Sequence, residues 1–458
     1  MSFADQPVTI AGAGPTGALL AILLARRGIR ALLFDSRPDP RAGGGKSGRS
    51  INLALADRGI HALELAGVLA EIRGELVPMR GRFVHSPDGS GSLQPYGRLP
   101  GEVIYSVSRQ VLNRALLTVA LREAGVEGHF EHRLEEADFD TRIARFKDLK
   151  GGAFVDVPMR PLLGADGAGS TARRLMAARG LIDVREAALE HGYKELAIPA
   201  GPRARHRMER EALHIWPRGG FMLIALPNTD GSFTATLFLP LQSFAALNSP
   251  RAIDEFLSAN FPDARAVMPD GVAEFQSNPV GSLGTVYAQG WHAGGTAALI
   301  GDSAHAIVPF HGQGMNCCFE DCVEFDAALG RHSSWQEVFA DFYSLRKPNT
   351  DAIAEMALDN YLEMRERVAD PRFRLQQALA LELERRYPRR FVPRYSMVMF
   401  HHEIPYRTAL ERGAVQSRLL ADLTRHADTL ADIDYDSAGR AVEERLAPLP
   451  ALSSVMKL

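Results

Sequence analysis

The N-terminal stretch VTIAGAGPTGALLAILLARRGIRALLFD, residues 8–35, decides the fold of this chain. A short apolar run leads into Gly12-Ala13-Gly14-Pro15-Thr16-Gly17, residues 18–27 have helical character, and a second apolar run ends at Asp35. Gly28 is placed to end the helix. The order strand, glycine turn, helix, strand predicts a βαβ unit.

The spacing Gly12-x-Gly14-x-x-Gly17 predicts that this unit binds a nucleotide. The first glycine allows a tight turn, the second lets the backbone approach a pyrophosphate, and the third lets helix and strand pack closely. The phosphates then lie against the N–H groups and the positive dipole end of the helix. Asp35 ends the second strand and is placed to accept a hydrogen bond from a ribose hydroxyl. A chance glycine-rich turn is the alternative, and strand, helix and acid in register argue against it.

The composition narrows the classes of function. The 458 residues include 52 Lys and Arg against 55 Asp and Glu, a net charge of −3, and no basic cluster indicates a nucleic-acid partner. Three cysteines, all within residues 317–322, exclude a disulfide scaffold and favour a reducing, cytoplasmic compartment. Apolar runs such as residues 18–25 fall short of the roughly 20 residues that span a bilayer, so no membrane anchor is expected. No metal is expected either, because His401-His402-Glu403 lacks HExxH spacing.

Beyond the βαβ unit, the pattern changes along the chain. Residues 49–66 have helical character, residues 78–105 alternate short apolar stretches with turn residues, and residues 213–240 carry the period-2 signal of an antiparallel sheet. Residues 296–300 form one more apolar strand, and from residue 334 onward the pattern is mostly helical. This order predicts a nucleotide-binding domain that is interrupted by a sheet domain and followed by helices.

Two later turns bear on which dinucleotide binds. Gly164-Ala165-Asp166-Gly167 follows one apolar run, and Gly301-Asp302 follows another. Asp302 opens the run DSAHAIVPFHGQGMNCCFED, in which a loop with Gly312 and Gly314 leads into a helix. An aspartate can bond a polyol chain, and glycines let backbone N–H groups approach the edge of a flavin ring. Taken alone, each motif is equally well explained as an ordinary turn.

Together, the three motifs resemble those of the aromatic-hydroxylase class of single-component FAD-dependent monooxygenases. That class has no separate nicotinamide domain, and the lack of a second GxGxxG in this chain fits it. Within the class, the similarity narrows to the kynurenine 3-monooxygenase family, runs from Val8 to about Phe400 and is most specific over residues 213–240. The segments that carry it are GRSINLALA (48–56), PMRGRFVH (78–85), LHIWPRGGFMLIALP (213–227) and PFHGQGMNCCFED (309–321).

The resemblance implies a substrate site. Arg82 would hold an amino-acid carboxylate in a bidentate pair, with added hydrogen bonds from Tyr96, Asn360 and Tyr395. Without the resemblance, these residues would be interpreted as a surface arginine, two core tyrosines and a polar helix residue.

The resemblance also implies a flavin site. Phe310 and His311 would lie near the reactive face of the flavin, although His311 could equally be a loop histidine with satisfied hydrogen bonds. Two positions depart from the family pattern: Asp35 stands where Glu is frequent, and Cys317-Cys318 replaces a small Ala-Gly pair. The residues implied to bind FAD are Gly12, Gly14, Thr16, Gly17, Asp35, Arg37, Ala54, Arg109, Leu134, Asp166, Asp302, Gly314, Met315 and Asn316.

The predicted fold class is α/β. It comprises a Rossmann-like FAD-binding domain, an inserted, mostly antiparallel β-sheet substrate domain and a C-terminal helical region. The expected bounds are 1–75, 102–180 and 280–330 for the FAD-binding domain, 76–101 and 181–279 for the substrate domain, and 331–458 for the helical domain.

The resemblance implies hydroxylation of L-kynurenine to 3-hydroxykynurenine, with FAD as cofactor, NADPH as co-substrate and O₂, through a flavin C4a-hydroperoxide. The substrate's aniline nitrogen directs electron density to the adjacent carbon, so no catalytic side chain is expected, and the protein binds, orients and excludes water. The alternatives are a hydroxylase of a benzoate or phenol and a non-catalytic flavin-binding or redox-sensing module. The docking site of NADPH and the oligomeric state, a homodimer included, stay open.

Overall fold

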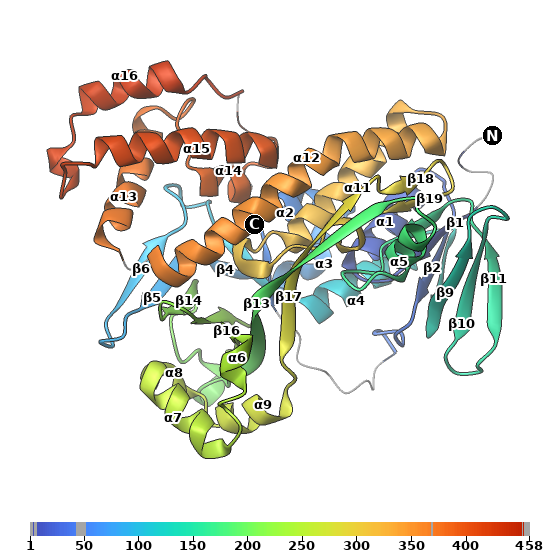
Figure 1. Ribbon diagram of the computed structural model, residues 1–458, viewed down its shortest axis with the longest axis horizontal. Coiled ribbons are helices and arrows are strands. Elements are labelled where there is room, and N and C mark those ends of the chain that lie inside the picture. The colour runs from blue at the N-terminus through green and yellow to red at the C-terminus, as the bar shows by residue number, and fades with distance from the viewer. Residues whose placement is uncertain (1–2, 4–6, 43–51, 368–369, 451, 453–458) are drawn as a thin grey trace.

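The N-terminal βαβ unit forms as predicted (Figure 1). The computed structural model describes residues 3, 7–42, 52–367, 370–450 and 452. In it, β1 (Val8–Ala11) pairs in parallel with β2 (Ala31–Asp35), and α1 (Pro15–Arg26) connects them. Residues 17–24 of α1 are all buried, because this helix is apolar on every side and packs between other helices and the sheet.

Chain segments far apart in the sequence meet in one parallel sheet. Its order is β18-β19-β12-β1-β2-β8, in which β12 (Leu162–Gly164) and β19 (Ala297–Leu299) extend the sheet beyond β1. β8 (Val126–Phe130) forms one edge, and the short antiparallel β18 (His292–Ala293) forms the other. Because the central strands are parallel, the turns after β1, β12 and β19 lie at the same end of the sheet. These turns are the three motifs recognised in the sequence.

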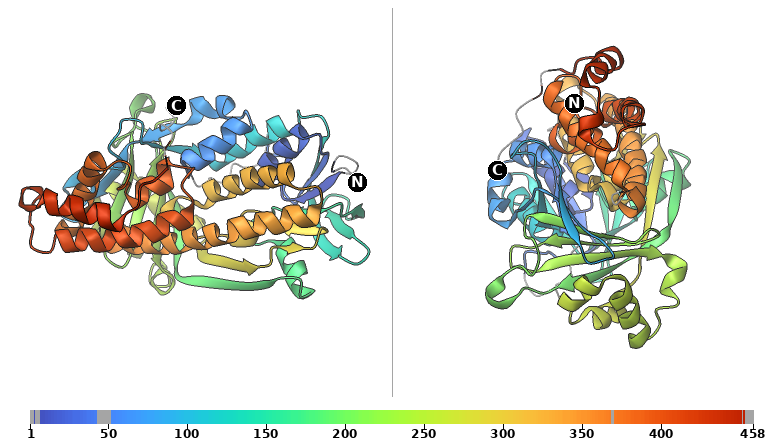
Figure 2. Two further views of the ribbon diagram at one scale, coloured as in Figure 1. Left: turned by 90° about the horizontal axis from the view of Figure 1, so that it is seen from above. Right: turned by 90° about the vertical axis from the view of Figure 1, so that its left-hand side faces the viewer.

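A second sheet of seven strands follows the order β17-β13-β16-β15-β14-β5-β6, with all neighbours antiparallel except β14 and β5. The antiparallel pattern predicted for residues 213–240 is therefore confirmed. Figure 2 shows this sheet between the C-terminal helices and a lobe of short helices. The strands are β5 (Gly81–His85), β6 (Gly91–Pro95), β13 (Asp183–Ile198), β14 (Ala212–Pro217), β15 (Met222–Pro227), β16 (Phe233–Pro240) and β17 (Gly281–Gln289), and the lobe is α6 (Leu241–Phe244), α7 (Pro250–Asn260), α8 (Pro262–Val267) and α9 (Gly271–Ser277).

The helix predicted over residues 49–66 is wrong in its first half. β3 (Asn52–Leu55) is a strand antiparallel to β7 (Ile104–Ser108), and α2 (Asp57–Leu65) begins only afterwards; residues 49–51 lie outside the described residues. The Asn52 amide donates to Ser106, to the Pro227 carbonyl and to Asn228. Such tertiary partners override a local helical pattern, and a single sequence does not reveal them.

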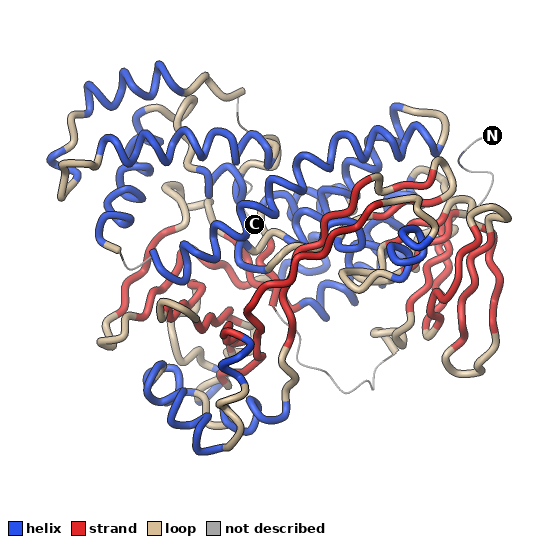
Figure 3. The backbone as a smooth tube through the Cα atoms, in the orientation of Figure 1, coloured by secondary structure: helices blue, strands red, loops and turns tan. Residues whose placement is uncertain are grey.

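One expected domain boundary does not coincide with a sheet boundary. β17 begins just after residue 280, where the FAD-binding domain was expected to resume, yet it pairs with β13 in the seven-stranded sheet. The two strands form the long ribbon that crosses the molecule in Figure 3. The division into domains stays a prediction.

The C-terminal region is helical, as predicted. α12 (Trp335–Leu362) follows α11 (Gly314–Arg331) and ends in a π-helical turn, Glu363–Arg367. Within the described part of the chain, no helix is long and apolar enough to cross a bilayer. The other C-terminal helices are α13 (Pro371–Arg386), α14 (Arg394–Phe400), α15 (Tyr406–Leu423), η6 (Leu430–Asp432) and α16 (Tyr435–Arg445). The remaining elements are α3 (Leu69–Ile72), η2 (Arg73–Glu75), β4 (Val77–Met79), α4 (Arg109–Ala120), β9 (His132–Asp138), β10 (Ile143–Asp148), β11 (Phe154–Pro158), α5 (Thr171–Ala178), η3 (Pro202–Ala204), α10 (Asp302–His305) and η4 (Pro309–His311).

Candidate active site: two cavities that share Asp302

The first cavity, of about 450 Å³, lies where β1, β2, β12 and β19 of the parallel sheet end. This is the end of an open α/β sheet at which ligands bind. Nine of the residues predicted to bind FAD line it: Gly12, Gly14, Thr16, Asp35, Arg37, Arg109, Leu134, Asp166 and Asp302.

The glycines of the first turn are required by close backbone contacts. Gly12 has φ +106°, and a Cβ there would lie 2.3 Å from the Ala165 carbonyl oxygen, in the turn after β12. A Cβ on Gly17 would lie 1.9 Å from the Gly12 carbonyl oxygen. At Gly14, the nearest atom to such a Cβ is the Arg37 Nη2 at 3.9 Å, so this residue borders open space. No side chain caps the start of α1, which leaves its first N–H groups for an anionic ligand.

Asp35 is fixed at the floor of the first cavity. Its carboxylate accepts hydrogen bonds from the Ala13 N–H at 2.8 Å and from the Arg37 guanidinium at 2.8 and 2.9 Å. Burial raises the pKa of Asp35, but the hydrogen bonds and charge of Arg37 outweigh burial and hold that pKa below its usual value. Asp35 is therefore an ionised acceptor.

Asp166 and Asp302 border the same cavity with different surroundings. The Asp166 carboxylate accepts hydrogen bonds from the Ser170 hydroxyl and the Thr171 N–H, and so caps the start of α5. The Cys318 thiol lies 3.4 Å from the Asp302 carboxylate, and burial raises the pKa of this thiol well above its usual value. Cys318 thus packs directly behind the Gly301-Asp302 turn as a neutral thiol, while the Cys317 sulfur lies 3.3 Å from Arg346.

The second cavity, of about 340 Å³, adjoins the first at Asp302 and opens over the seven-stranded sheet. Strands β14–β16 supply one wall, and α12, η4 and α14 supply the other. Besides Asp302, it is lined by all four predicted substrate residues, Arg82, Tyr96, Asn360 and Tyr395, and by the predicted flavin-side residues Ala54, Phe310 and His311.

Arg82 is the cationic group of the second cavity. It lies on β5, is 8% exposed, and faces the Tyr395 ring at 4.9 Å and the Tyr96 ring at 5.7 Å. The two tyrosine rings stack at 5.3 Å. Burial alone would lower the pKa of Arg82. Tyr395 and the Glu363 carboxylate, which lies 3.0 Å from Nη1, outweigh burial and raise that pKa above its usual value, so the guanidinium stays charged.

Asn360 and the aromatic residues close the other end of this cavity. The Asn360 amide donates to the Phe310 carbonyl at 2.6 Å, while its oxygen lies 3.5 Å from Arg82 Nη2. Phe310 stacks on Tyr361 at 4.0 Å. His311 stacks on Tyr395 at 5.5 Å, and burial lowers the pKa of its imidazole to about 3, so the ring is neutral. Asn360 therefore holds the Phe310–His311 turn against the arginine.

Four residues predicted to bind FAD, Gly17 of the first turn among them, do not line either cavity. Gly314 begins α11, and Met315 packs at the edge of the main core. Asn316 is fully buried: its oxygen accepts the Ala56 N–H at 2.9 Å and its nitrogen donates to the Ala54 and Gly312 carbonyls. It therefore fixes the junction of β3 and α2 against the glycine loop, and its cofactor role stays a prediction.

Two further residues of the site were missed from the sequence. Glu363 pairs with Arg82 from the π-helical turn, and its place three residues after Asn360 on one helix was the available signal. Asn52 lines the second cavity, but its segment was interpreted as helix.

Two groups of metal-type side chains occur in the described part of the chain: His305, Cys317 and Asp321, and Asp57, His402 and Glu403. The Asp321 carboxylate already accepts hydrogen bonds from the Gly301 N–H and the Arg346 guanidinium. The Asp57 carboxylate accepts a hydrogen bond from the His402 backbone N–H and lies at hydrogen-bond distance from the His402 Nδ1. We assign no ion to either group.

Comparisons with known proteins find a family model and full-length relatives that match this chain. A family model described as "FAD binding domain" matches residues 5–335. The kynurenine 3-monooxygenase of Stenotrophomonas maltophilia is 48% identical over 456 residues, 99% of each chain, and that of Myxococcus xanthus is 46% identical over 444 residues, 96% of each.

The chain belongs to the kynurenine 3-monooxygenase family. It is thus a flavoprotein of the aromatic monooxygenase class, and FAD is its cofactor. Two solved structures share the fold: a tetrameric form of 2-methyl-3-hydroxypyridine-5-carboxylic acid oxygenase (TM-score 0.65, 20% identity, 83% of this chain and 97% of that one) and P. aeruginosa PqsL in complex with 2-aminobenzoylacetate (TM-score 0.65, 23% identity, 79% and 97%).

FAD fits the first cavity of this family member. The side-chain-free space at Gly14, the uncapped start of α1 and the ionised Asp35 suit a pyrophosphate and a ribose.

Proposed function

We propose that this chain hydroxylates L-kynurenine to 3-hydroxykynurenine, with NADPH and O₂ as co-substrates. Membership of the family supports the proposal, and one observation carries it. A buried, charged arginine lies beside two stacked tyrosines in a cavity that meets the FAD cavity at Asp302. An amino acid with an aromatic ring matches a cavity with one cationic end and apolar walls.

The amino-acid end of the substrate binds at Arg82 in this proposal. The guanidinium pairs with the carboxylate, and the Tyr96 hydroxyl, a buried group with no hydrogen-bond partner in the described part of the chain, supplies a further hydrogen bond. Glu363 already contacts the same guanidinium and is placed to accept the ammonium group. Asn360 fixes the position of the Phe310–His311 turn through its hydrogen bond to the Phe310 carbonyl.

The aromatic end of the substrate lies among apolar side chains. Phe238 packs on Phe310 at 5.0 Å, and Leu213 and Ile224 line the same wall. These groups exclude water from the reacting ring, and His311 stays neutral beside them. FAD, reduced by NADPH, supplies the activated oxygen when bound. The residues that would hold it are those that line the first cavity, and the family resemblance is the support for proposing that Gly17, Ala54, Gly314, Met315 and Asn316 also contact it.

Anaerobic reduction of the bound flavin by NADPH, measured with and without kynurenine, tests the proposal together with product analysis in air. We expect kynurenine to accelerate NADPH oxidation and 3-hydroxykynurenine to form. A panel of benzoates and phenols, scored for product beside hydrogen peroxide release, is the control. Product from one of these and not from kynurenine would contradict the assignment, and tight FAD without turnover on any aromatic would indicate a sensor.

We also propose a reducing, cytoplasmic setting. Its support is that Cys317, Cys318 and Cys322 are all free and buried thiols. A homodimer is compatible with the fold, and size-exclusion chromatography with light scattering tests it.

A further inference from the structure

We infer that NADPH docks in a third cavity, on the side of β3 away from Arg82, with its phosphates on the arginine loop of residues 201–207. The inference rests on the proposed function, since it assigns a place to that reaction's reductant. The third cavity has a volume of about 360 Å³ and lies among β3, β7, β13 and the turn before β16. Asn52, Ser106, Asn228 and Thr234 are among its lining residues.

A thin polar partition separates the third cavity from the second. Asn52 and Thr234 line both cavities, and the Thr234 hydroxyl lies 3.3 Å from the Asn52 amide oxygen. The Asn52 amide also bonds to Ser106 and Asn228. Asn52 and Thr234 therefore stand between the third cavity and the second cavity, which reaches Asp302. A reductant bound here is adjacent to the reaction space without occupying the substrate's place at Arg82.

The arginine loop borders the mouth of the third cavity. Ala204 contacts Gly231 through its backbone, since a Cβ on Gly231 would lie 2.3 Å from the Ala204 oxygen. The His206 ring donates to the Asn228 carbonyl at 2.8 Å. Both contacts are with the turn of residues 228–232, whose members line the cavity. The loop and the cavity are therefore parts of one surface.

The loop carries cations without partners. Arg203 and Arg205 are exposed, and in the described ranges neither guanidinium has a hydrogen bond or an acidic partner, although the Arg205 carbonyl accepts the Gly201 N–H. The turn between them places Arg203 and Ala204 at φ +59° and +55°, a conformation that non-glycine residues rarely adopt. Guanidinium groups held outward in this way suit phosphate, which they bind in a bidentate manner.

The charges inside the cavity have the opposite sign. Glu75, Glu195 and Asp230 line it, so phosphates are disfavoured there. A nicotinamide ring becomes cationic when it loses hydride, and carboxylates favour that product. Bound there, NADPH would supply the hydride that reduces FAD once the Asn52 and Thr234 side chains turn aside, a proton from water would complete the reduced flavin, and NADP⁺ would leave. Acidic interior and basic mouth together orient the dinucleotide with its nicotinamide inward.

Calorimetric titration of the FAD-loaded enzyme with NADP⁺ tests the site. For the double variant Arg203→Gln/Arg205→Gln we expect NADP⁺ binding to weaken roughly tenfold or more, because charge-assisted hydrogen bonds to phosphate are lost. The salt dependence of binding should fall as well. The matched control is Arg374→Gln/Arg418→Gln, which removes two exposed arginines of α13 and α15. Thr229→Trp, at the cavity's rim, should weaken NADP⁺ and NAD⁺ alike.

Unchanged NADP⁺ affinity in the loop variant, or an equal loss in the control, would overturn this site. FAD content and kynurenine affinity should stay at the parent level in all three variants. If the parent turns over kynurenine but the loop variant binds NADP⁺ normally, the site fails and the proposed function stands. If the loop variant loses NADP⁺ binding but the parent never hydroxylates kynurenine, the proposed function fails and the site stands.

Discussion

At the scale of single residues, Arg82 tests the substrate assignment most directly. Arg82→Ala should weaken kynurenine binding about 10- to 100-fold, since it removes charge-assisted hydrogen bonds worth roughly 1.5–3 kcal/mol. FAD should stay bound, because Arg82 lines only the second cavity. Titration of the flavin absorbance with kynurenine measures the change. Arg80→Ala, at an exposed arginine paired with Glu211, is the control and should leave binding unchanged. Loss of FAD from Arg82→Ala would instead make Arg82 structural.

His311 contributes a pH dependence of stability. Burial lowers the pKa of its imidazole to about 3, against about 6.5 in an unfolded chain. The unfolded state therefore binds more protons below pH 6.5, and stability falls as the pH falls from there toward 3. The slope is about 1.4 kcal/mol per pH unit for this one group. Urea unfolding at pH 6 and pH 5 should show a smaller loss in His311→Gln than in the parent. His426→Gln, at an exposed histidine, should lose as much unfolding free energy between pH 6 and pH 5 as the parent does. An equal loss in the parent and in His311→Gln would contradict the assignment.

At the scale of elements, the turn between β1 and α1 depends on Gly12. Gly12→Ala combines a positive φ with a Cβ 2.3 Å from backbone of the second motif, so either β1 or β12 must shift. Gly28→Ala is the matched control, because Gly28 has φ +77° but open space around its Cβ position. The control should cost roughly 1–2 kcal/mol of unfolding free energy. Gly12→Ala should cost more and also lower the FAD content of the purified protein. A Gly12→Ala protein that is purified with a full complement of bound FAD would show that the turn is not the phosphate site.

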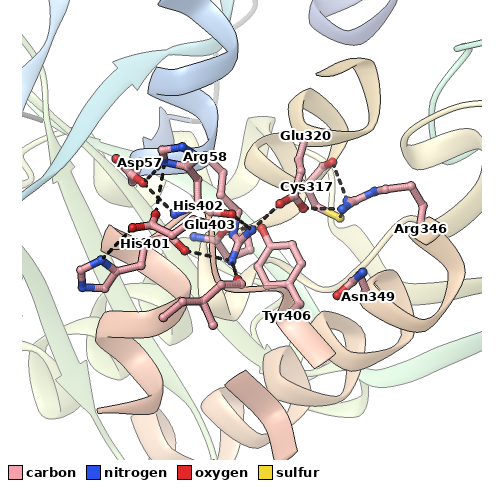
Figure 4. A network of polar contacts seen from close by, with 12 residues as sticks. Asp57, Arg58, Cys317, Glu320, Arg346, Asn349, His401, His402, Glu403 and Tyr406 are labelled. Atoms are coloured by element: carbon pink, nitrogen blue, oxygen red, sulfur yellow. Dashed lines mark hydrogen bonds and ion pairs between the residues drawn. The ribbon is translucent and has the colours of Figure 1, made fainter. Parts of the chain in front are cut away.

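At the scale of the whole molecule, buried ion pairs and hydrogen bonds connect the C-terminal region to the FAD-binding fold (Figure 4). Arg58 of α2 lies over the Tyr406 ring at 3.9 Å, donates to the carbonyls of His402 and Ile404, and pairs with Glu320. Arg346 of α12 pairs with the same Glu320. It also pairs with Asp321 at 2.7 Å. Asp321 in turn accepts the Gly301 N–H, so this network reaches the third FAD motif.

Removing one partner of this network leaves buried charge without compensation. Arg346→Met should therefore lower the unfolding free energy by about 3–5 kcal/mol. Arg251→Met, in an exposed pair with Glu255, should change it by less than about 1 kcal/mol. Chemical denaturation followed by fluorescence and by flavin release measures both. The two variants unfolding alike would show that the network adds little to the stability of the whole molecule.

The parts that could be predicted are those whose requirements are local. The GxGxxG motif, the two apolar runs and the acid at the end of β2 lie within one short stretch. Gly12 and Gly17 are required there because a Cβ at either position would clash with nearby backbone. The pattern also indicated the antiparallel sheet and the helical C-terminal region. Residues such as Arg82 and Tyr395 were reached only through family resemblance, because nothing in their neighbourhoods in the sequence marks them.

The sequence by itself determined the dinucleotide fold, since spacing in a βαβ unit is a local property of backbone and glycine. Only the tertiary structure decided that Asn52 begins a strand, that β17 joins the seven-stranded sheet and that Glu363 shares a guanidinium with the substrate site. The physical reason is common to all three. Their energies come from partners that lie 54 to 281 residues away along the chain, and such contacts leave no periodic trace in the sequence around them.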